Sequence, residues 1–282
     1  MKRPTPVDKM FVDEDLVGNN RVDRMMTTKA HSGQTVAVVL PTYCEAENIE
    51  NLIRDLNGLK LNLLITVIDD SSPDGTVKIV KKIQKEYDNV VLFVRPKKLG
   101  LGTAIIDAFR LVLSFKNPPD HIVTMDADYS HNPQDIPNLI QAAKLGYDLV
   151  IGSRYCEGGK IVGWHRMRWL ISRFANFIAS AVVRIKIHDC TSGLRCYSKR
   201  YVTTVLPNLH SQTYEIQIET VKQAQLQGFH VKEIPITFVN RKRGKSKLTR
   251  AEFQGFLSYV LNQLHTNVGF SRTARKQYLG KK

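Results

Sequence analysis

The sequence predicts an α/β fold in which a mostly parallel, Rossmann-like sheet is flanked by helices. Apolar, β-branched runs recur along the chain, and segments whose apolar residues have helical spacing separate them. Strands that alternate with helices form βαβ units and a parallel sheet covered on both faces. The 282 residues accommodate one such domain, which we place at 35–265, after a disordered tail at 1–34 and before a basic tail at 266–282.

The predicted elements follow one another in a regular order. The run TVAVVLPTY (35–43) predicts a buried strand stopped by Pro41, and EAENIENLIRDLNGL (45–59) predicts a helix that ends near Gly58. Later strands are expected in LLITVIDD (63–70), VVLFVRP (90–96), HIVTMDAD (121–128) and YDLVIGSRY (147–155). The helices between them are expected in GTVKIVKKIQKEY (75–87), GTAIIDAFRLVLSF (102–115) and QDIPNLIQAAKLG (134–146).

Composition and charge limit the class of protein. The four cysteines form no C-x-x-C pair, which argues against a zinc site and fits a reducing compartment. No secretory signal is recognisable, and no run of about 18 apolar residues predicts a transmembrane segment. Of the net charge of +15, residues 1–153 contribute −2 and residues 154–282 contribute +17. The second half therefore faces phosphates, a membrane surface or nucleic acid, unless it is only a solvated basic surface.

The segment WHRMRWLISRFANFIASAVVRIKI (164–187) predicts an amphipathic helix with a basic polar face. Its apolar face comprises Trp164, Met167, Leu170, Ile171, Phe174, Phe177, Ile178, Ala181, Val182 and Ile185. Such a helix lies in a membrane interface or packs on the core of its own domain, and the sequence leaves both interpretations open. A last helix, AEFQGFLSYVLNQL (251–264), is apolar enough to dock or to touch a bilayer.

Asp126 and Asp128 end one predicted strand, so ligands are expected near them, because ligands bind beyond the carboxyl ends of parallel strands. Like charges this close repel, and a metal ion, a lysine or only water is expected between them. Mg²⁺ and Mn²⁺ prefer carboxylate oxygens and keep positions open for phosphate. The D-x-D pattern alone is weak, but such a metal would neutralise the acids and hold a leaving nucleotide diphosphate.

Carboxylates also follow two neighbouring strands. Asp70 can accept hydrogen bonds from a nucleobase or ribose; the alternative is a helix cap, a role that Asp74 fits better. Tyr43 can pack on a base and Glu45 can contact sugar hydroxyls, or Glu45 merely favours the helix N-terminus. The turn LGLGTA (99–104) lacks the third glycine of a dinucleotide fingerprint, so we reject a nicotinamide site. The sequence motif of a P-loop is not present either, so a P-loop is not expected.

Basic residues provide candidate phosphate ligands in the second half. Arg154 follows the strand that ends in GSRY, and NRKRGKSK (240–247) is a glycine-containing basic loop. Arginine binds phosphate through two parallel hydrogen bonds. A nucleic-acid patch or a solvated loop is the alternative for this segment.

Taken together, the motifs VVLPTYCEAENI, VIDDSSPDGT, MDADYSHNP, GSRY and ITFVNRKRGKSKL resemble those of the dolichyl-phosphate mannose synthases, which are polyprenyl-phosphate glycosyltransferases of family 2 with the GT-A fold. The resemblance spans roughly residues 36–265. It implies an inverting transfer of mannose from GDP-mannose to a polyprenyl (dolichyl) phosphate with Mg²⁺ or Mn²⁺. The acceptor phosphate is already an anionic nucleophile, so it needs no strong general base.

The resemblance also implies roles for individual residues. The positions that match nucleotide contacts are Pro41, Tyr43, Glu45, Ile68 and Asp70; those that match the metal and nucleotide-sugar motif are Asp126, Ala127 and Asp128; those that match phosphate-holding residues are Arg154, Arg241 and Lys247. Asp126 and Asp128 are the expected metal ligands, and Asp128 and Arg154 the expected catalytic residues.

The chain departs from the family pattern at two positions. Cys44 replaces the usual Asn and cannot make the same two-way hydrogen bonds, while Ser130 replaces a Gln that ligates the metal in some members, so water is an alternative third ligand. The resemblance is to the compact type, held at the cytoplasmic face of a membrane by surface helices or small anchoring subunits. That membrane is the endoplasmic reticulum in a eukaryote and the plasma membrane in a prokaryote.

Two alternatives remain at this stage. The first is a polyprenyl-phosphate glycosyltransferase that uses UDP-glucose or another nucleotide sugar. The second is a basic nucleic-acid-binding module, which the clustered acids disfavour because they repel nucleic acid. Nucleic acid is therefore not an expected partner.

Overall fold

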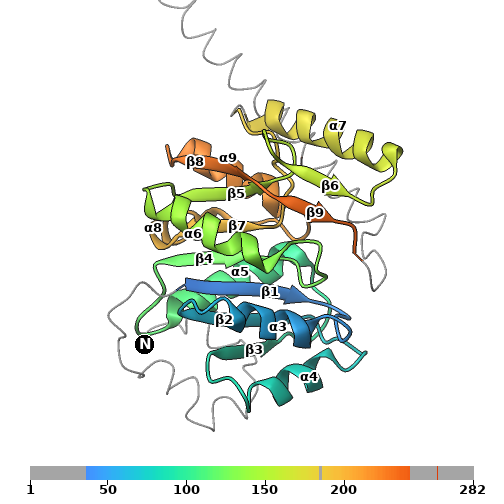
Figure 1. The fold of residues 1–282 in the computed structure, drawn as a ribbon. Coiled ribbons are helices and arrows are strands. Elements are labelled where there is room, and N and C mark those ends of the chain that lie inside the picture. Colours follow the sequence, from blue (N-terminus) through green and yellow to red (C-terminus); the bar gives the residue numbers. More distant parts are fainter. Residues whose placement is uncertain (1–35, 184–185, 242–258, 260–282) are drawn as a thin grey trace, which may run out of the picture.

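A computed structural model describes residues 36–183, 186–241 and 259, and it contains the predicted α/β architecture (Figure 1). The central sheet has seven strands in the order β3-β2-β1-β4-β7-β5-β8. These strands are β1 (Val36–Thr42), β2 (Leu63–Asp69), β3 (Val90–Val94), β4 (His121–Thr124), β5 (Leu149–Ser153), β7 (Arg195–Ser198) and β8 (Val231–Pro235). A small parallel pair lies beside it, formed by β6 (Lys160–Val162) and β9 (Thr237–Val239).

Helices cover both faces of the sheet, which confirms the prediction. They are α3 (Ile49–Gly58), α4 (Thr76–Ile83), α5 (Leu101–Ser114), α6 (Ile136–Lys144), α7 (Arg166–Val183), α8 (Lys199–Val205) and α9 (Ile216–Leu226), with 3-10 turns η2 (Pro133–Asp135) and η3 (Leu206–Asn208). Alternate residues of β1 enter different cores: Ala37 packs with α5, α8 and α9, and Val38 packs with α3, α4 and α6. The period of two therefore divides the interior into two layers.

Two details of the sheet differ from the prediction. β1 does not stop at Pro41 but continues to Thr42, whose carbonyl accepts the Asp70 N–H at 3.0 Å. β7 is antiparallel to β4 and β5, and its four-residue sequence RCYS gave no apolar run from which to predict it. Its Arg195 is fully buried because carbonyls and a hydroxyl satisfy the guanidinium.

The helix α7 turns its apolar side chains away from the domain. Phe174 and Phe177 are 64% and 72% exposed, and the side chains of Met167, Leu170 and Ile171 are exposed as well. The buried side carries small or polar residues, as in Ala179 and Asn176, whose amide donates to Thr191 at 3.0 Å. The interpretation that the apolar face packs on the core is therefore wrong for the five exposed residues named above. Ile178 of the same face does pack against the core.

No helix in residues 36–183 and 186–241 is long and apolar enough to cross a membrane. The predicted helix at 251–264 and the basic loop beyond Arg241 lie outside the described residues, apart from Tyr259, as do both predicted tails.

The turn LGLG brings the start of α5 against the loop that precedes α9. The N–H groups of Gly102 and Thr103 donate to the Gln212 carbonyl at 3.0 and 3.3 Å. A Cβ added at Gly102 would lie 2.4 Å from the Ser211 carbonyl oxygen, and one added at Gly100, where φ is +100°, would lie 2.4 Å from the Gln212 carbonyl oxygen. Both glycines therefore permit a close backbone approach that any side chain would prevent.

Replacing Gly102 by Ala should force these backbones apart and lower the free energy of unfolding by about 2 kcal/mol. Gly58 is the matched control, because a Cβ there meets nothing within 4 Å, so Gly58→Ala should stay within about 1 kcal/mol of the wild type. Urea denaturation of the two variants measures both effects. Equal stability of the two variants would show that the loop yields freely.

Candidate active site

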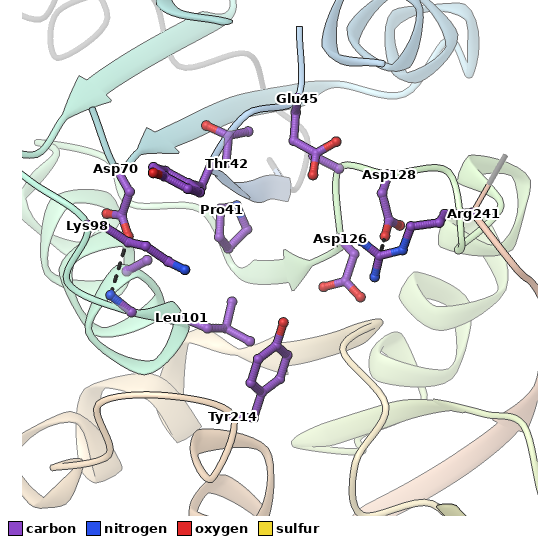
Figure 2. Close-up of a pocket in the computed structure, with 14 residues that line it drawn as sticks. Pro41, Thr42, Glu45, Asp70, Lys98, Leu101, Asp126, Asp128, Tyr214 and Arg241 are labelled. Carbon is purple, nitrogen blue, oxygen red and sulfur yellow. Dashed lines mark hydrogen bonds and ion pairs between the residues drawn. The ribbon is translucent and has the colours of Figure 1, made fainter. Parts of the chain in front are cut away.

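The predicted strand ends do meet at one edge of the sheet, where they form a pocket (Figure 2). The residues that line it are Pro41, Thr42, Tyr43, Glu45, Asp70, Lys98, Gly100, Leu101, Ala104, Asp126, Ala127, Asp128, Tyr214 and Arg241. Most of the predicted site residues are thus brought together from segments far apart in the sequence. Among the others, Ile68 is fully buried in β2, Arg154 is not among the lining residues, and Lys247 lies outside the described residues.

An arginine provides the positive charge that the paired acids require. Arg241 lies 3.2 Å from the Asp128 carboxylate, which also accepts the Ser130 N–H at 3.0 Å. Burial raises the pKa of Asp128, but the hydrogen bonding by Ser130 and the charge of Arg241 outweigh it and hold that pKa below its ordinary value. Asp128 is therefore ionised at neutral pH.

A buried histidine braces the neighbouring acid. The Asp126 N–H donates to His131 Nδ1 at 3.4 Å, and the Asp126 carboxylate lies 3.7 Å from the same nitrogen. Burial lowers the pKa of His131 from 6.5 to about 4, so the imidazole is neutral and Nδ1 acts as an acceptor. Gly193 approaches from the other side, where an added Cβ would lie 3.0 Å from an Asp126 carboxylate oxygen.

Asp70 holds the opposite end of the pocket in place. Its carboxylate pairs with the buried Arg95 and accepts the N–H groups of Leu99 and Gly100 at 3.1 and 3.3 Å. Burial raises the pKa of Asp70 even though Arg95 opposes this. Through its hydrogen bonds with Leu99 and Gly100, Asp70 orders the turn that carries Lys98. The ammonium of Lys98 lies 4.9 Å from the centre of the Tyr43 ring.

The acids of the DDSSPDGT motif divide their roles. Asp69 is fully buried and accepts hydrogen bonds from Thr42 and Ser72. Asp74 accepts the Thr76 N–H at 3.1 Å at the start of α4 and the Ala46 N–H at 3.0 Å. The N-cap residue of α4 is Gly75, so Asp74 lies one residue before the N-cap position. The Asp74 carboxylate still accepts an N–H at the start of the helix and ties two loops of the pocket together.

The Cys44 backbone explains why Asn is usual at this position. Cys44 has φ +56°, in the left-handed region where Asn is favoured over other side chains. The loop keeps its order through the Cys44 N–H, which donates to the Ser72 hydroxyl at 2.9 Å. Ser71 follows Asp70 after β2, and Tyr129 follows Asp128 after β4. Both residues also have positive φ, so each of these three loops turns sharply shortly after its strand ends.

Arg154 lies in a buried ion pair beside the pocket. Its guanidinium makes two hydrogen bonds of 2.7 Å to Asp189 and a third to Thr191. The rings of Tyr155, Trp164 and Phe238 surround it at 5.2 to 5.7 Å. Burial opposes its charge, but Asp189 raises the pKa of Arg154 above its ordinary value. Its Nε and Nη2 groups are thus occupied within the protein.

Six of the lining residues were not predicted as site residues: Thr42, Lys98, Gly100, Leu101, Ala104 and Tyr214. Arg168, which is not a lining residue, was not predicted either. Arg168 on α7 donates to Asn240 at 3.0 Å and stacks on Trp164 at 4.1 Å. Burial lowers the pKa of Arg168, and the nearby charges of Arg241 and Arg154 act in the same direction. Arginines from three segments therefore gather beside Asp128. Only the high content of basic residues in this half hinted at Arg168.

The two carboxylates supply the oxygen ligands of a candidate cation site. Within the described part of the chain, no group of three or more His, Cys, Asp and Glu side chains is arranged to hold a metal ion. Mg²⁺ and Mn²⁺ commonly bind through one or two carboxylates together with substrate phosphates and water. Asp126 and Asp128 fit that ligand set, whereas the imidazole of His131 already accepts the Asp126 N–H.

The fold and site define a Rossmann-like α/β protein with an acidic pocket at the carboxyl edge of its sheet. A family model described as glycosyl transferase family 2 matches residues 37–206. The chain therefore belongs to glycosyl transferase family 2 and is a glycosyltransferase, as the motif resemblance implied.

Curated relatives agree with this assignment. A polyprenol monophosphomannose synthase from Mycolicibacterium smegmatis is 35% identical over 218 residues, which cover 77% of this chain and 82% of the relative. A dolichol-phosphate mannosyltransferase from Pyrococcus furiosus is 37% identical over 229 residues, which cover 80% of this chain and 62% of the relative.

Solved structures confirm the GT-A-type fold. Glucosyl-3-phosphoglycerate synthase from Mycobacterium tuberculosis, solved with Mn²⁺ and UDP, has a TM-score of 0.61 at 17% identity, over 88% of this chain and 84% of that chain. A mannosyltransferase from Pyrobaculum calidifontis, solved with GDP-Man and Mn²⁺, has a TM-score of 0.51 at 19% identity, over 81% and 65%.

The neutral state of His131 predicts a pH dependence of stability. Between pH 6.5 and about 4 the unfolded chain protonates this histidine while the folded chain does not, so the free energy of unfolding should fall as the pH falls through that range. His131→Asn keeps an acceptor for the Asp126 N–H but cannot titrate. Urea denaturation at pH 7 and pH 5 should show a smaller loss in this variant, and equal losses would contradict the assignment.

Proposed function

We propose that this chain transfers mannose from GDP-mannose to a polyprenyl (dolichyl) monophosphate, with inversion at the anomeric carbon. The observation that carries the proposal is the pairing of Asp128 with Arg241 in a pocket of the family 2 fold, next to a cluster of arginines. Acids beside cations suit a metal-bound sugar nucleotide that meets an anionic acceptor. Relatives named as polyprenol and dolichol-phosphate mannosyltransferases support the choice of both substrates.

The nucleotide is assigned to the end of the pocket formed by Pro41, Tyr43, Asp70 and Lys98. The Tyr43 ring with Lys98 beside it offers an aromatic and cationic surface for a base. Glu45 lines the same pocket and is buried, so its carboxylate can accept hydrogen bonds from sugar hydroxyls. The side chain of Ile68 in β2 is fully buried, so this residue can contact the nucleotide only through its main chain.

Asp126 and Asp128 are the proposed metal ligands. When bound, Mg²⁺ or Mn²⁺ supplies positive charge that stabilises the leaving diphosphate. Mn²⁺ in the two solved glycosyltransferases supports a divalent cation at this site. Local hydrogen bonds position both acids, because the Asp126 N–H donates to His131 and the Ser130 N–H donates to the Asp128 carboxylate.

The acceptor phosphate is assigned to the arginines of the second half. It is already an anion, so the enzyme has to align it with the anomeric carbon rather than remove a proton from it. Arg168 and Arg241 are the proposed phosphate ligands, together with Lys247 of the loop beyond. Arg154 is assigned a supporting role, because Asp189 and Thr191 hold its Nε and Nη2 groups.

The exposed face of α7 is the proposed membrane contact. Six large apolar side chains point outward from one helix that also carries Arg168. A basic helix with an exposed apolar face binds in the headgroup region of a bilayer. This supports a position at a membrane surface, where the proposed lipid acceptor is found. The cytoplasmic side and anchoring subunits remain predictions from the family resemblance.

Asp128→Asn should lower the rate of mannosyl transfer by at least about 100-fold, because a ligand of the proposed metal loses its charge. Transfer is measured by product analysis with GDP-mannose and a short polyprenyl phosphate, with and without divalent cation. Asp120→Asn is the control, because that exposed acid pairs with Lys199 outside the pocket. Full activity of Asp128→Asn with an unchanged Tm would contradict the metal role, and preference for UDP-glucose would overturn the donor assignment.

Replacing Phe174 and Phe177 by Ser should weaken binding to lipid vesicles on the order of 100-fold, since two exposed aromatic side chains are lost. The matched control replaces Leu145 and Leu226, which are 77% and 60% exposed but lie outside α7. Vesicle co-sedimentation measures binding, and transfer to a short, water-soluble acceptor reports an intact site. Unchanged sedimentation of the α7 variant would place the anchor elsewhere.

A further inference from the structure

The two halves of the chain contribute unequally to the pocket. Twelve of the fourteen lining residues lie between Pro41 and Asp128, and among the described residues only Tyr214 and Arg241 come from the second half. The first group forms the proposed nucleotide and metal contacts. Arg241 is already assigned to the acceptor phosphate, so Tyr214 is left to meet the part of the donor that extends beyond the nucleotide, which is the group to be transferred.

Tyr214 is directed into the pocket. Figure 2 shows its hydroxyl pointing towards the space between Leu101 and Asp126, on the side of the pocket opposite Glu45. The phenol thus lines the same pocket as the acid that is assigned to the metal. A group joined to a metal-bound diphosphate would lie within reach of this wall.

The loop that carries Tyr214 is fixed by two glutamates. The N–H groups of Gln212 and Thr213 donate to the Glu215 carboxylate at 2.8 and 2.9 Å. Those of His210 and Ser211 donate to Glu219 at 3.1 and 2.9 Å. Four consecutive amides are therefore held by carboxylates. Burial raises the pKa of Glu215, but its hydrogen bonds to Thr213 prevail and hold the pKa below its ordinary value.

The other side of this loop is held by the LGLG turn. The Gln212 carbonyl accepts two N–H groups from the start of α5, and the absence of a side chain at Gly102 allows that contact. The same contact uses the amides that a phosphate would otherwise approach at this helix end. The turn therefore positions the 210–214 loop instead of holding a phosphate, and Tyr214 is preorganised.

We propose that Tyr214 contacts the hexose of the sugar nucleotide and fixes its position relative to the diphosphate. The two second-half residues differ in chemistry: Arg241 is a cation that suits phosphate oxygens, whereas the phenol is a neutral donor with an apolar ring. Hexoses present neutral hydroxyls and C–H faces, which match a phenol better than a guanidinium does. This inference rests on the proposed function, since it presumes a hexose donor.

The experiment compares donor and product nucleotide in one variant. Tyr214→Phe removes a single hydroxyl, so the Tm should match that of the wild type. Calorimetry in saturating Mn²⁺ should show GDP-mannose binding about 3- to 10-fold more weakly, the effect of one lost hydrogen bond. GDP, which has no hexose, should bind within about twofold of the wild type. Tyr87→Phe is the matched control, because that tyrosine contacts Arg54 outside the pocket.

Each outcome decides between the claims. Equal weakening of GDP and GDP-mannose would show that Tyr214 contacts the nucleotide, and unchanged affinity for both would show that it contacts neither; both results overturn the hexose assignment. If the wild-type protein binds GDP and GDP-mannose with equal affinity, the hexose assignment is overturned as well. Wild-type protein that binds neither ligand overturns the proposed function itself, and the assignment with it.

Discussion

Repulsion between carboxylates gathered at one edge of the sheet is the constraint on which the site depends. Parallel strands bring their carboxyl ends together, and in this chain those ends carry Asp69, Asp70, Asp126 and Asp128. Each of these carboxylates has a different neighbour. Asp69 accepts hydroxyl and amide donors, Asp70 pairs with Arg95, Asp128 meets Arg241, and Asp126 lies against a neutral histidine. The acids therefore share one location but not one chemical role.

The partners of the acids distinguish those that build the pocket from those that face a ligand. Asp69 is fully buried, and Asp70 forms a buried ion pair with Arg95, in which removing one partner leaves an uncompensated charge. Such pairs are part of the framework. Asp126 is partly exposed to the pocket. Asp128 also reaches the pocket, where its carboxylate pairs with Arg241. A ligand can compete for these two acids, whereas it cannot reach Asp69.

Features set by local sequence could be predicted, and features set by long-range contacts could not. Apolar runs and the residues that follow them located the strand ends, so Asp126 and Asp128 were found without the structure. Tyr214 and Arg168 were missed because their loop and helix reach the pocket only through contacts with distant segments, such as Gln212 with Gly102. Periodicity likewise showed that α7 has two faces, but not that its small and polar face is the one packed inward. That choice depends on Thr191 and Tyr155, which lie elsewhere in the fold and form hydrogen bonds with Asn176 and Ser172 of α7.

The position of α7 relative to the pocket follows from the cage around Arg154. Asp189 and three aromatic rings fix this arginine at the end of β5, and one of those rings, Trp164, lies just before α7 and also stacks on Arg168. The helix proposed to lie on the membrane is thus tied to the same edge of the sheet as Asp128. A lipid phosphate has to reach the donor while its chain stays in the bilayer. A rigid link between the membrane contact and the pocket sets that distance, which is a physical reason for burying Arg154 so completely.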